Sequence, residues 1–164
     1  MDIIHEAGFS YDSSIYPVVH DNYGLRGGPH VPHRLRLPNG GSLIEFPITT
    51  SRVLGVDLPV GGGGYFRLYP YQVTQRLLAR RSRRLEAPFV FYLHPWELDP
   101  TQPRIAGAGW RSRLRHYLNL DKVEARLSQL LHDFEFTSMA TVLQNVESLP
   151  EHSYASNGDW QPAR

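Results

Sequence analysis

The chain has no cysteine among its 164 residues. This absence excludes disulfide bonds, thiolate nucleophiles and cysteine-ligated zinc sites together. An excess of charge is also lacking, because 17 lysine and arginine residues stand against 16 acidic residues. The net charge of +1 argues against a dedicated polyanion binder, so we expect no nucleic-acid partner. A local cluster lacks interleaved aromatic residues and is typical of a solvated helix end: Arg80, Arg81, Arg83 and Arg84.

Long hydrophobic runs are missing as well. No apolar stretch approaches the roughly 20 residues that span a bilayer, and no charged-then-apolar leader opens the sequence. These two observations predict a soluble, cytoplasmic chain without a membrane partner. Its length is sufficient for one domain with a core of its own.

The patterns that are present alternate between strand and helix. Strands are predicted at 9–13, 43–46, 53–60, 89–94 and 134–136, and helices at 1–7, 71–85, 121–132 and 141–146. This alternation predicts an α/β fold, with too few elements for a complete eight-unit barrel of roughly 250 residues. Residues 17–42 are rich in Pro, Gly and His and predict a long loop. Residues 148–164 lack periodicity and predict a disordered tail beyond a domain at 1–147.

Four consecutive glycines precede the helix predicted at 71–85. The run 61–64 lacks the Lys-Ser/Thr pair of a phosphate-binding loop and the GxGxxG spacing of a dinucleotide site. Because glycine has no Cβ, such a run lets the backbone approach a ligand or a neighbouring strand closely. We therefore expect a close approach of backbone here and not a phosphate cradle.

Residues 88–104, PFVFYLHPWELDPTQPR, join an apolar run to a group of polar side chains. The run predicts a buried strand that ends at His94, with Trp96, Glu97 and Asp99 just beyond. α/β enzymes place catalytic side chains at such strand ends, and a histidine oriented by a carboxylate exchanges a proton near neutral pH. The alternative is a core strand whose histidine only caps the edge. Trp96 fits either a contact with a sugar ring or a closed core.

Other catalytic chemistries have weaker support. Ser13 and Ser14 follow a predicted strand without a G-x-S-x-G motif, and serines in such places typically bond the local turn. His30 and His33 can chelate in principle, but two neighbouring prolines extend the segment, so the rings need not share a face. The sequence has no HExxH, no HxxxH and no adjacent Asp-Asp pair. We therefore expect this chain to bind no metal by itself.

Several longer blocks occur in one order along the chain: EAGFSYDSSIYP, HDNYG, LIEFPITT, LPVGGGGYFRLYP, FYLHPWELDPTQPRI and RHYLNLD. Over roughly residues 3–140 they resemble the C-terminal half of polysaccharide deacetylases from exosortase (PEP-CTERM) exopolysaccharide loci. These are NodB-homology proteins, similar to the family-four carbohydrate esterases. The resemblance implies a partial (β/α) barrel, the C-terminal half of the family's distorted barrel.

The resemblance also implies metal-dependent hydrolysis of N-acetyl groups on a polysaccharide. In the family, one Asp and two His hold a divalent metal, with zinc the expected ion, and an adjacent Asp activates the metal-bound water. A C-terminal histidine protonates the leaving amine, and that role maps to His94. Tyr92 and Leu93 would line the acetyl pocket beside it.

The family's metal-binding motifs have no counterpart in this sequence. Its Asp-Asp, histidine and arginine motifs all precede the matched segment, so no metal ligand carries over. We therefore expect a truncated or split deacetylase that is inactive alone. Its expected partners are an N-acetylated polysaccharide and a missing N-terminal half, or further copies of itself. Half of a barrel would leave open sheet edges and an apolar face, which predicts marginal stability or self-association.

Two alternatives stay open at the level of sequence. One is a non-catalytic carbohydrate-binding or accessory domain with sugar-facing aromatic residues: Trp96, Tyr65, Tyr69 and Trp110. The other is a self-sufficient hydrolase whose metal site is built from four histidines: His20, His30, His33 and His94.

Overall fold

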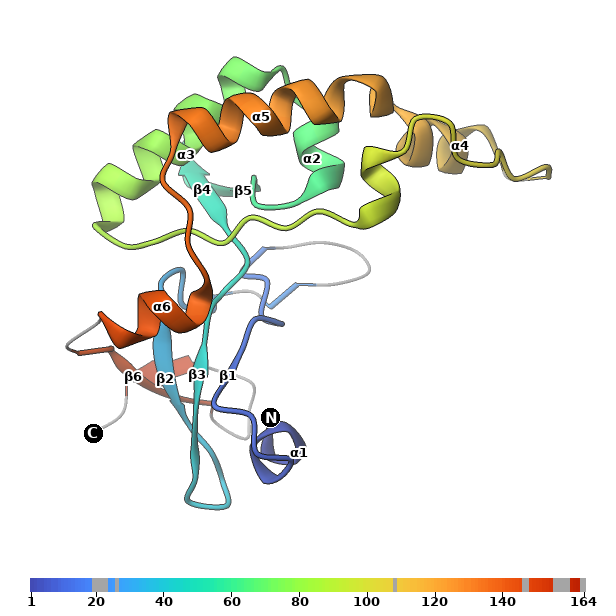
Figure 1. Cartoon of the computed structure of the whole chain (residues 1–164). Coiled ribbons are helices and arrows are strands. Elements are labelled where there is room, and N and C mark those ends of the chain that lie inside the picture. Colours follow the sequence, from blue (N-terminus) through green and yellow to red (C-terminus); the bar gives the residue numbers. More distant parts are fainter. Residues whose placement is uncertain (19–23, 26, 108, 146–147, 155–159, 163–164) are drawn as a thin grey trace.

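The computed structural model describes residues 1–18, 24–25, 27–107, 109–145, 148–154 and 160–162 (Figure 1). In chain order the elements are α1 (Asp2–Glu6), β1 (Tyr11–Asp12), β2 (His33–Arg36), β3 (Ser42–Glu45), β4 (Thr50–Val53), β5 (Val56–Pro59), α2 (Gly63–Leu68), α3 (Tyr71–Leu85), η1 (Pro95–Leu98), α4 (Trp110–Tyr117), η2 (Leu120–Lys122), α5 (Val123–Asp133), α6 (Met139–Gln144), β6 (Glu151–Tyr154) and β7 (Trp160–Pro162). The fold is mixed α/β, as predicted. Within the described ranges the strands close into no barrel.

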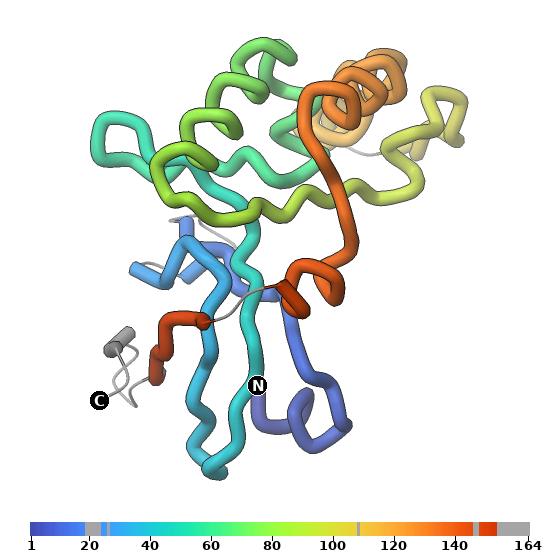
Figure 2. The backbone as a smooth tube through the Cα atoms, turned by 60° about the vertical axis from the view of Figure 1, so that its left-hand side comes forward, coloured from blue at the N-terminus to red at the C-terminus, as the bar shows by residue number. Residues whose placement is uncertain are grey.

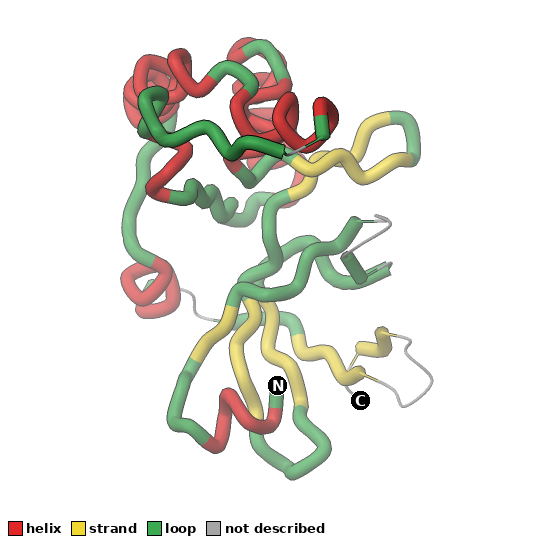
Figure 3. Tube along the Cα trace, turned by 90° about the vertical axis from the view of Figure 1, so that its right-hand side faces the viewer, coloured by secondary structure: helices red, strands yellow, loops and turns green. Residues whose placement is uncertain are grey.

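The elements gather into two parts, each with its own core. Helices α2 to α5 and the β4–β5 hairpin form one part, and the larger sheet with α1 and α6 forms the other (Figures 1 and 2). Colouring by secondary structure shows the same division, with most helices at one end and most strands at the other (Figure 3). No helix in the described ranges is both long and apolar enough to cross a membrane.

The larger sheet has the strand order β1-β3-β2-β6-β7. β1 runs parallel to β3, β2 and β3 form an antiparallel hairpin, and β6 runs parallel to β2. A small apolar cluster of Leu35, Leu37 and Leu43, packed by Ile4, lies on this sheet. The register places Glu45 beside both Asp12 of β1 and His33 of β2, so three titratable residues meet at one end of the sheet.

Two predictions for this sheet were wrong. Residues 17–42 were expected to form a loop, yet β2 lies within them, because the alternating buried residues His33 and Leu35 pair with β3. Residues 148–164 were expected to be disordered, yet β6 pairs with β2, where Arg36 and Glu151 form a 2.8 Å ion pair. Residues 155–159 and 163–164 of that range lie outside the described residues. In both cases the partner strand supplies hydrogen bonds that local composition does not show.

In the helical part, α3 spans the predicted residues 71–85. Its buried side chains recur at helical spacing, and two of them, Tyr71 and Leu78, belong to the main core cluster with Val60, Phe66, Val123 and Leu130. The predicted strand 53–60 is part of a hairpin, whose turn uses positive φ at Leu54 (49°) and Gly55 (85°). The predicted strand 134–136 is extended without strand pairing, because Phe134 and Phe136 pack edge-on against Phe89 instead.

Candidate active site around His94

The segment leading to His94 is extended and has two different faces. Phe89, Phe91 and Leu93 pack against the main core cluster. Tyr92 and His94 alternate with them and are exposed. This period of two is that of a β-strand, and the segment runs beneath the helices, between them and the larger sheet (Figure 1).

The predicted strand 89–94 is nevertheless not part of a sheet. Its only bridge within the described residues is a parallel one between Gly62 and Tyr92, where Tyr92 N donates to Gly61 O at 2.9 Å. On the other side, the side chain of Thr49 takes the place of a neighbouring strand. Its Oγ1 donates to Val90 O at 2.6 Å and accepts from Val90 N at 2.8 Å. The prediction of an extended segment was right. A β-sheet also requires a neighbouring strand that forms a series of backbone hydrogen bonds, and the described residues do not provide one.

The glycine run makes this approach possible. A Cβ on Gly61 would lie 2.6 Å from Val90 O, and one on Gly62 would lie 2.6 Å from the Tyr92 hydroxyl oxygen. A Cβ on Gly63 would overlap the Glu97 carboxylate. The expected close approach of backbone is therefore confirmed at 61–63, but not at Gly64, and the neighbour is the segment that carries His94.

A buried ion pair fixes the backbone at His94. Glu97 Oε2 accepts a hydrogen bond from His94 N at 2.9 Å, and Glu97 N donates to His94 O at the same distance. Glu97 Oε1 accepts from Arg67 Nε at 3.0 Å, with side-chain exposures of 1% and 3%. Arg67 Nη1 also donates to three carbonyl oxygens at the end of α4, those of Arg115, His116 and Leu118. The Arg67–Glu97 pair thus connects α2, η1 and α4.

The sequence predicted that Glu97 or Asp99 would orient the ring of His94. Glu97 instead bonds the His94 backbone, and Asp99 accepts hydrogen bonds from Thr101 N and Oγ1. His94 is the N-cap of η1 and Glu97 is the third residue of that turn, so their mutual bonds follow from the local geometry of the turn. The ring of His94 is positioned by aromatic neighbours.

These neighbours form a short row of rings. Tyr92 meets His94 edge-on at 5.7 Å, and His94 stacks on Trp96 at 5.6 Å with 9° between the planes. Trp96 stacks in turn on His116 at 4.4 Å, and His116 Nε2 lies 2.9 Å from Gln102 Oε1. The structure therefore brings together three of the predicted site residues, Tyr92, His94 and Trp96.

Leu93 is the predicted site residue that lies elsewhere, since it packs toward the helical core on the face opposite His94. Sequence reasoning missed Arg67 and His116. Arg67 lies in the apolar stretch YFRLYP, and no local pattern indicates that it pairs with Glu97, thirty residues later. His116 lies on α4 among exposed arginines, and this local pattern gives no sign that its ring stacks on Trp96.

Tyr92 also lines a groove of about 520 Å³ together with Ser14, Ile15, Tyr16 and Ile48. Ser14 bonds the Asp12 carboxylate, and Ser13 Oγ donates to Phe46 O at 2.7 Å. Ser14 thus bonds the local turn, as the sequence predicted, whereas Ser13 bonds a carbonyl 33 residues away.

Glu45 is a buried acid that neighbours this groove. Burial raises the pKa of the Glu45 carboxyl to about 7. The hydrogen bond from Ile15 N, 2.8 Å long, opposes the rise in pKa, and the nearby Asp12 charge adds to it. A carboxyl group that titrates near neutral pH is thus hydrogen-bonded to Ile15, a residue that lines the groove.

The histidines that the structure describes do not come together as a metal site. Among the described residues, no three His, Cys, Asp or Glu side chains come together in a way that could hold an ion. His30 Nδ1 lies 2.8 Å from Thr50 Oγ1, whereas the buried His33 packs against His152 at 5.1 Å. His20 lies outside the described residues. The donor set in the described part of the chain therefore does not fit a catalytic metal.

These observations define a mixed α/β domain whose candidate site is a histidine two residues beyond a groove-lining tyrosine. Residues 13–144 match the family described as a domain of unknown function, DUF3473. The chain belongs to this family. No curated protein and no solved structure shows significant similarity to this chain.

Proposed function

We propose that this chain supplies the histidine-bearing half of a metal-dependent polysaccharide N-deacetylase site. The observation that carries the proposal is the placement of His94 at the end of an extended segment, with its backbone fixed by the buried Arg67–Glu97 pair. The ordered sequence blocks that resemble polysaccharide deacetylases support it. The DUF3473 domain is known in exopolysaccharide loci with deacetylase-like proteins, which is consistent with the same assignment.

His94 would act as the general acid in this reaction. In amide hydrolysis, a water oxygen bonds to the acetyl carbon, the carbon–nitrogen bond breaks, and the sugar nitrogen must gain a proton before it leaves. A protonated imidazole beside that nitrogen supplies the proton. Tyr92 lies on the same face as His94 and would line the space for the acetyl group, while Trp96 holds the imidazole plane by stacking.

The metal-binding half of the site is assigned to residues outside this sequence. The described histidines and carboxylates do not converge on an ion, so no step of the reaction is routed through a metal held by this chain. The exposed face of segment 88–94 would then meet the metal-binding half. A partial barrel, completed by that second half, is the arrangement that the proposal requires.

The test is acetate release from N-acetylated oligosaccharides by the chain, with added Zn²⁺, in the presence and absence of a recombinant metal-binding half. We expect activity only in the mixture. His94→Ala should lower kcat by about 10²–10⁴-fold, the usual contribution of a general acid. His132→Ala, an exposed histidine on α5, is the matched control. An inactive mixture, or full activity in His94→Ala, would rule out the proposal.

A second candidate is a non-catalytic carbohydrate-binding domain. The observation in its favour is Trp110 on α4, whose side chain is 71% exposed and lines a groove with Tyr117. Trp96 is less available for a sugar, because His94, His116 and the Arg67 guanidinium all lie against its rings. Titration with N-acetylated oligosaccharides, followed by tryptophan fluorescence, distinguishes the two. Unchanged fluorescence at millimolar ligand would exclude this second candidate.

A further inference from the structure

The β4–β5 hairpin lies beside α3 (Figure 1). A second, basic pocket is lined by residues of this hairpin and of the C-terminal half of α3. Its volume is about 190 Å³, and it shares no lining residue with the His94 site. The charged side chains around it come from three elements: Arg52 from β4, Asp57 from β5, and Arg80, Arg81 and Arg84 from α3. Four arginines therefore face one aspartate, and the remaining polar lining comes from His30, Thr50 and Ser51.

The single carboxylate is already engaged at one side of the pocket. Asp57 Oδ2 lies 3.9 Å from Arg52 Nη1 and 3.8 Å from His30 Nε2. The three α3 arginines that line the pocket have no carboxylate partner in the part of the chain that the structure describes. Arg80 and Arg84 are one helical turn apart, where like charges repel each other. The positive charge on this side is therefore uncompensated by the protein.

Arg81 is the buried member of the cluster. Its side chain is held by carbonyl oxygens, since Nη1 donates to Pro88 O at 2.9 Å and Nη2 donates to His30 O at 2.7 Å. The residue is only 3% exposed, and its Nε is a buried donor without a hydrogen-bond partner in the structure. Burial lowers the pKa of Arg81 to about 10, so the guanidinium stays charged at neutral pH. A buried cation with an unused donor is costly unless an anion completes it.

We propose that this pocket binds a small oxyanion group, a phosphate, sulfate or carboxylate. Arginine guanidinium groups present their donors in a planar fork that matches such anions. Arg81 would hold the anion from the pocket floor, while Arg80 and Arg84 contribute charge from the exposed rim. A pocket of this volume accommodates one oxyanion group or one acidic sugar residue. It is too small for a polymer that lies across a flat surface. The inference is independent of the chemistry assigned to His94.

Isothermal titration calorimetry at constant ionic strength tests the site. The ligands are inorganic phosphate, inorganic sulfate, glucuronate for a sugar carboxylate, and glucose as the neutral comparison. We expect one-to-one binding of at least one oxyanion and none of glucose. Binding of phosphate and sulfate alone would identify a free tetrahedral anion as the ligand, and binding of glucuronate would identify an acidic sugar.

Variants of α3 locate the binding. Arg80→Gln and Arg84→Gln remove exposed side chains that line the pocket, and each should raise Kd roughly tenfold through the loss of a charge-assisted hydrogen bond. Arg83→Gln removes an equally exposed arginine of the same helix that does not line the pocket, and it should leave Kd unchanged. Absence of binding to the native chain at millimolar oxyanion, or equal weakening by Arg83→Gln, would overturn the proposal.

Discussion

At the residue scale, the Arg67–Glu97 pair links the main elements around the candidate site. Both side chains are almost fully buried. One carboxylate oxygen of Glu97 accepts from Arg67, and the other accepts from the backbone N of His94. Burial of two charges is costly unless each is paired and hydrogen-bonded. The position of the His94 backbone therefore depends strongly on a buried pair of charged side chains.

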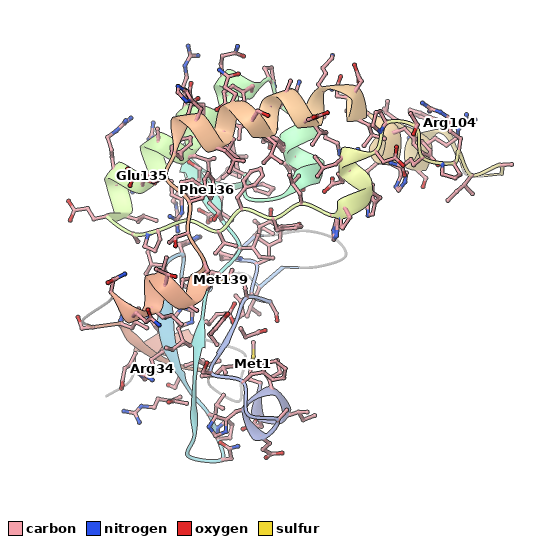
Figure 4. The ribbon with its side chains drawn as sticks, viewed as in Figure 1. Met1, Arg34, Arg104, Glu135, Phe136 and Met139 are labelled. Atoms are coloured by element: carbon pink, nitrogen blue, oxygen red, sulfur yellow. The ribbon has the colours of Figure 1, made fainter. Side chains whose placement is uncertain are left out.

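Removal of the Glu97 carboxylate should accordingly destabilise the fold. Glu97→Ala leaves the Arg67 guanidinium buried without a counter-charge, and we expect a loss of about 3–5 kcal/mol in the free energy of unfolding. Urea denaturation followed by circular dichroism measures this. Glu135→Ala, at an exposed position on the connection to α6 (Figure 4), should cost less than about 0.5 kcal/mol. Equal unfolding midpoints for the two variants would contradict this assignment.

Glu45 makes stability depend on pH in the direction opposite to most carboxylates. Its pKa is about 7 in the folded chain, against an ordinary value of 4.5. The folded state therefore keeps the proton over a range in which the unfolded chain has released it. The stability that this group contributes is complete below about pH 4.5 and is lost as pH rises through about 7.

Glu45→Gln should remove this dependence, because the amide oxygen can still accept from Ile15 N without titrating. The difference in unfolding free energy between the variant and the native chain should grow by about 3 kcal/mol between pH 5 and pH 8. Denaturant titrations at several pH values measure it. The difference isolates Glu45 from His30, His33 and His152, whose lowered pKa values act with the opposite sign. A difference that does not change with pH would show that Glu45 is ionised throughout.

At the scale of elements, the glycine run and segment 88–94 behave as one unit. The backbone at 61–63 lies against Val90, Tyr92 and Glu97, and these contacts leave no room for side chains. Helix α2 begins within the run, so its first turn and the path of the His94 segment are set together. Gly64 differs from its neighbours because a Cβ there would meet open space.

Alanine substitutions separate the two kinds of glycine. Gly61→Ala would place a Cβ 2.6 Å from Val90 O and 2.7 Å from Thr49 Cβ, and we expect a loss of about 1–3 kcal/mol in stability from overpacking. Gly64→Ala lies within α2, and alanine should stabilise that helix by roughly 0.5–1 kcal/mol. Thermal unfolding of both variants measures the two effects. A Gly61→Ala protein as stable as the native chain would show that the contact with segment 88–94 is loose.

At the scale of the whole molecule, two parts with separate cores are joined by only a few crossings of the chain (Figure 2). Several large apolar side chains lie on the surface, among them Leu54 at 98% and Val56 at 59% exposure, both on the β4–β5 hairpin. This hairpin is a two-stranded sheet with an outer edge at β5. Exposed edges with apolar side chains promote association between chains.

The isolated chain should therefore self-associate. Light scattering coupled to size-exclusion chromatography should give a mass that rises with protein concentration. Leu54→Lys combined with Val56→Lys places charge on the β5 edge and should shift the chain toward monomer. A native chain that stays monomeric and melts in one sharp cooperative transition would contradict this prediction.

The limits of prediction from sequence follow the range of the interactions. Helix α3 was predicted at its observed residues, because its apolar spacing and the preceding Pro70 are local signals. β6 was missed because its partner β2 lies far away in the sequence. β2 was missed because its Pro-, Gly- and His-rich surroundings indicate a loop, although its partner β3 follows directly in a hairpin. At the candidate site, Tyr92, His94 and Trp96 were found from one stretch, whereas Arg67, thirty residues earlier, was not. The solvated helix end expected at Arg80–Arg84 is wrong at Arg81, which is buried.

The sequence by itself determined the mixed α/β class, the long helix, the close approach at the glycines and the stretch that carries His94. These depend on side-chain periodicity and on backbone conformations that only certain residues adopt. The tertiary structure alone decided which neighbours each of these features meets. It paired Glu97 with Arg67, buried Glu45 and assembled the arginines of α3 with β4 and β5, because burial and charge pairing are properties of side chains brought together in space.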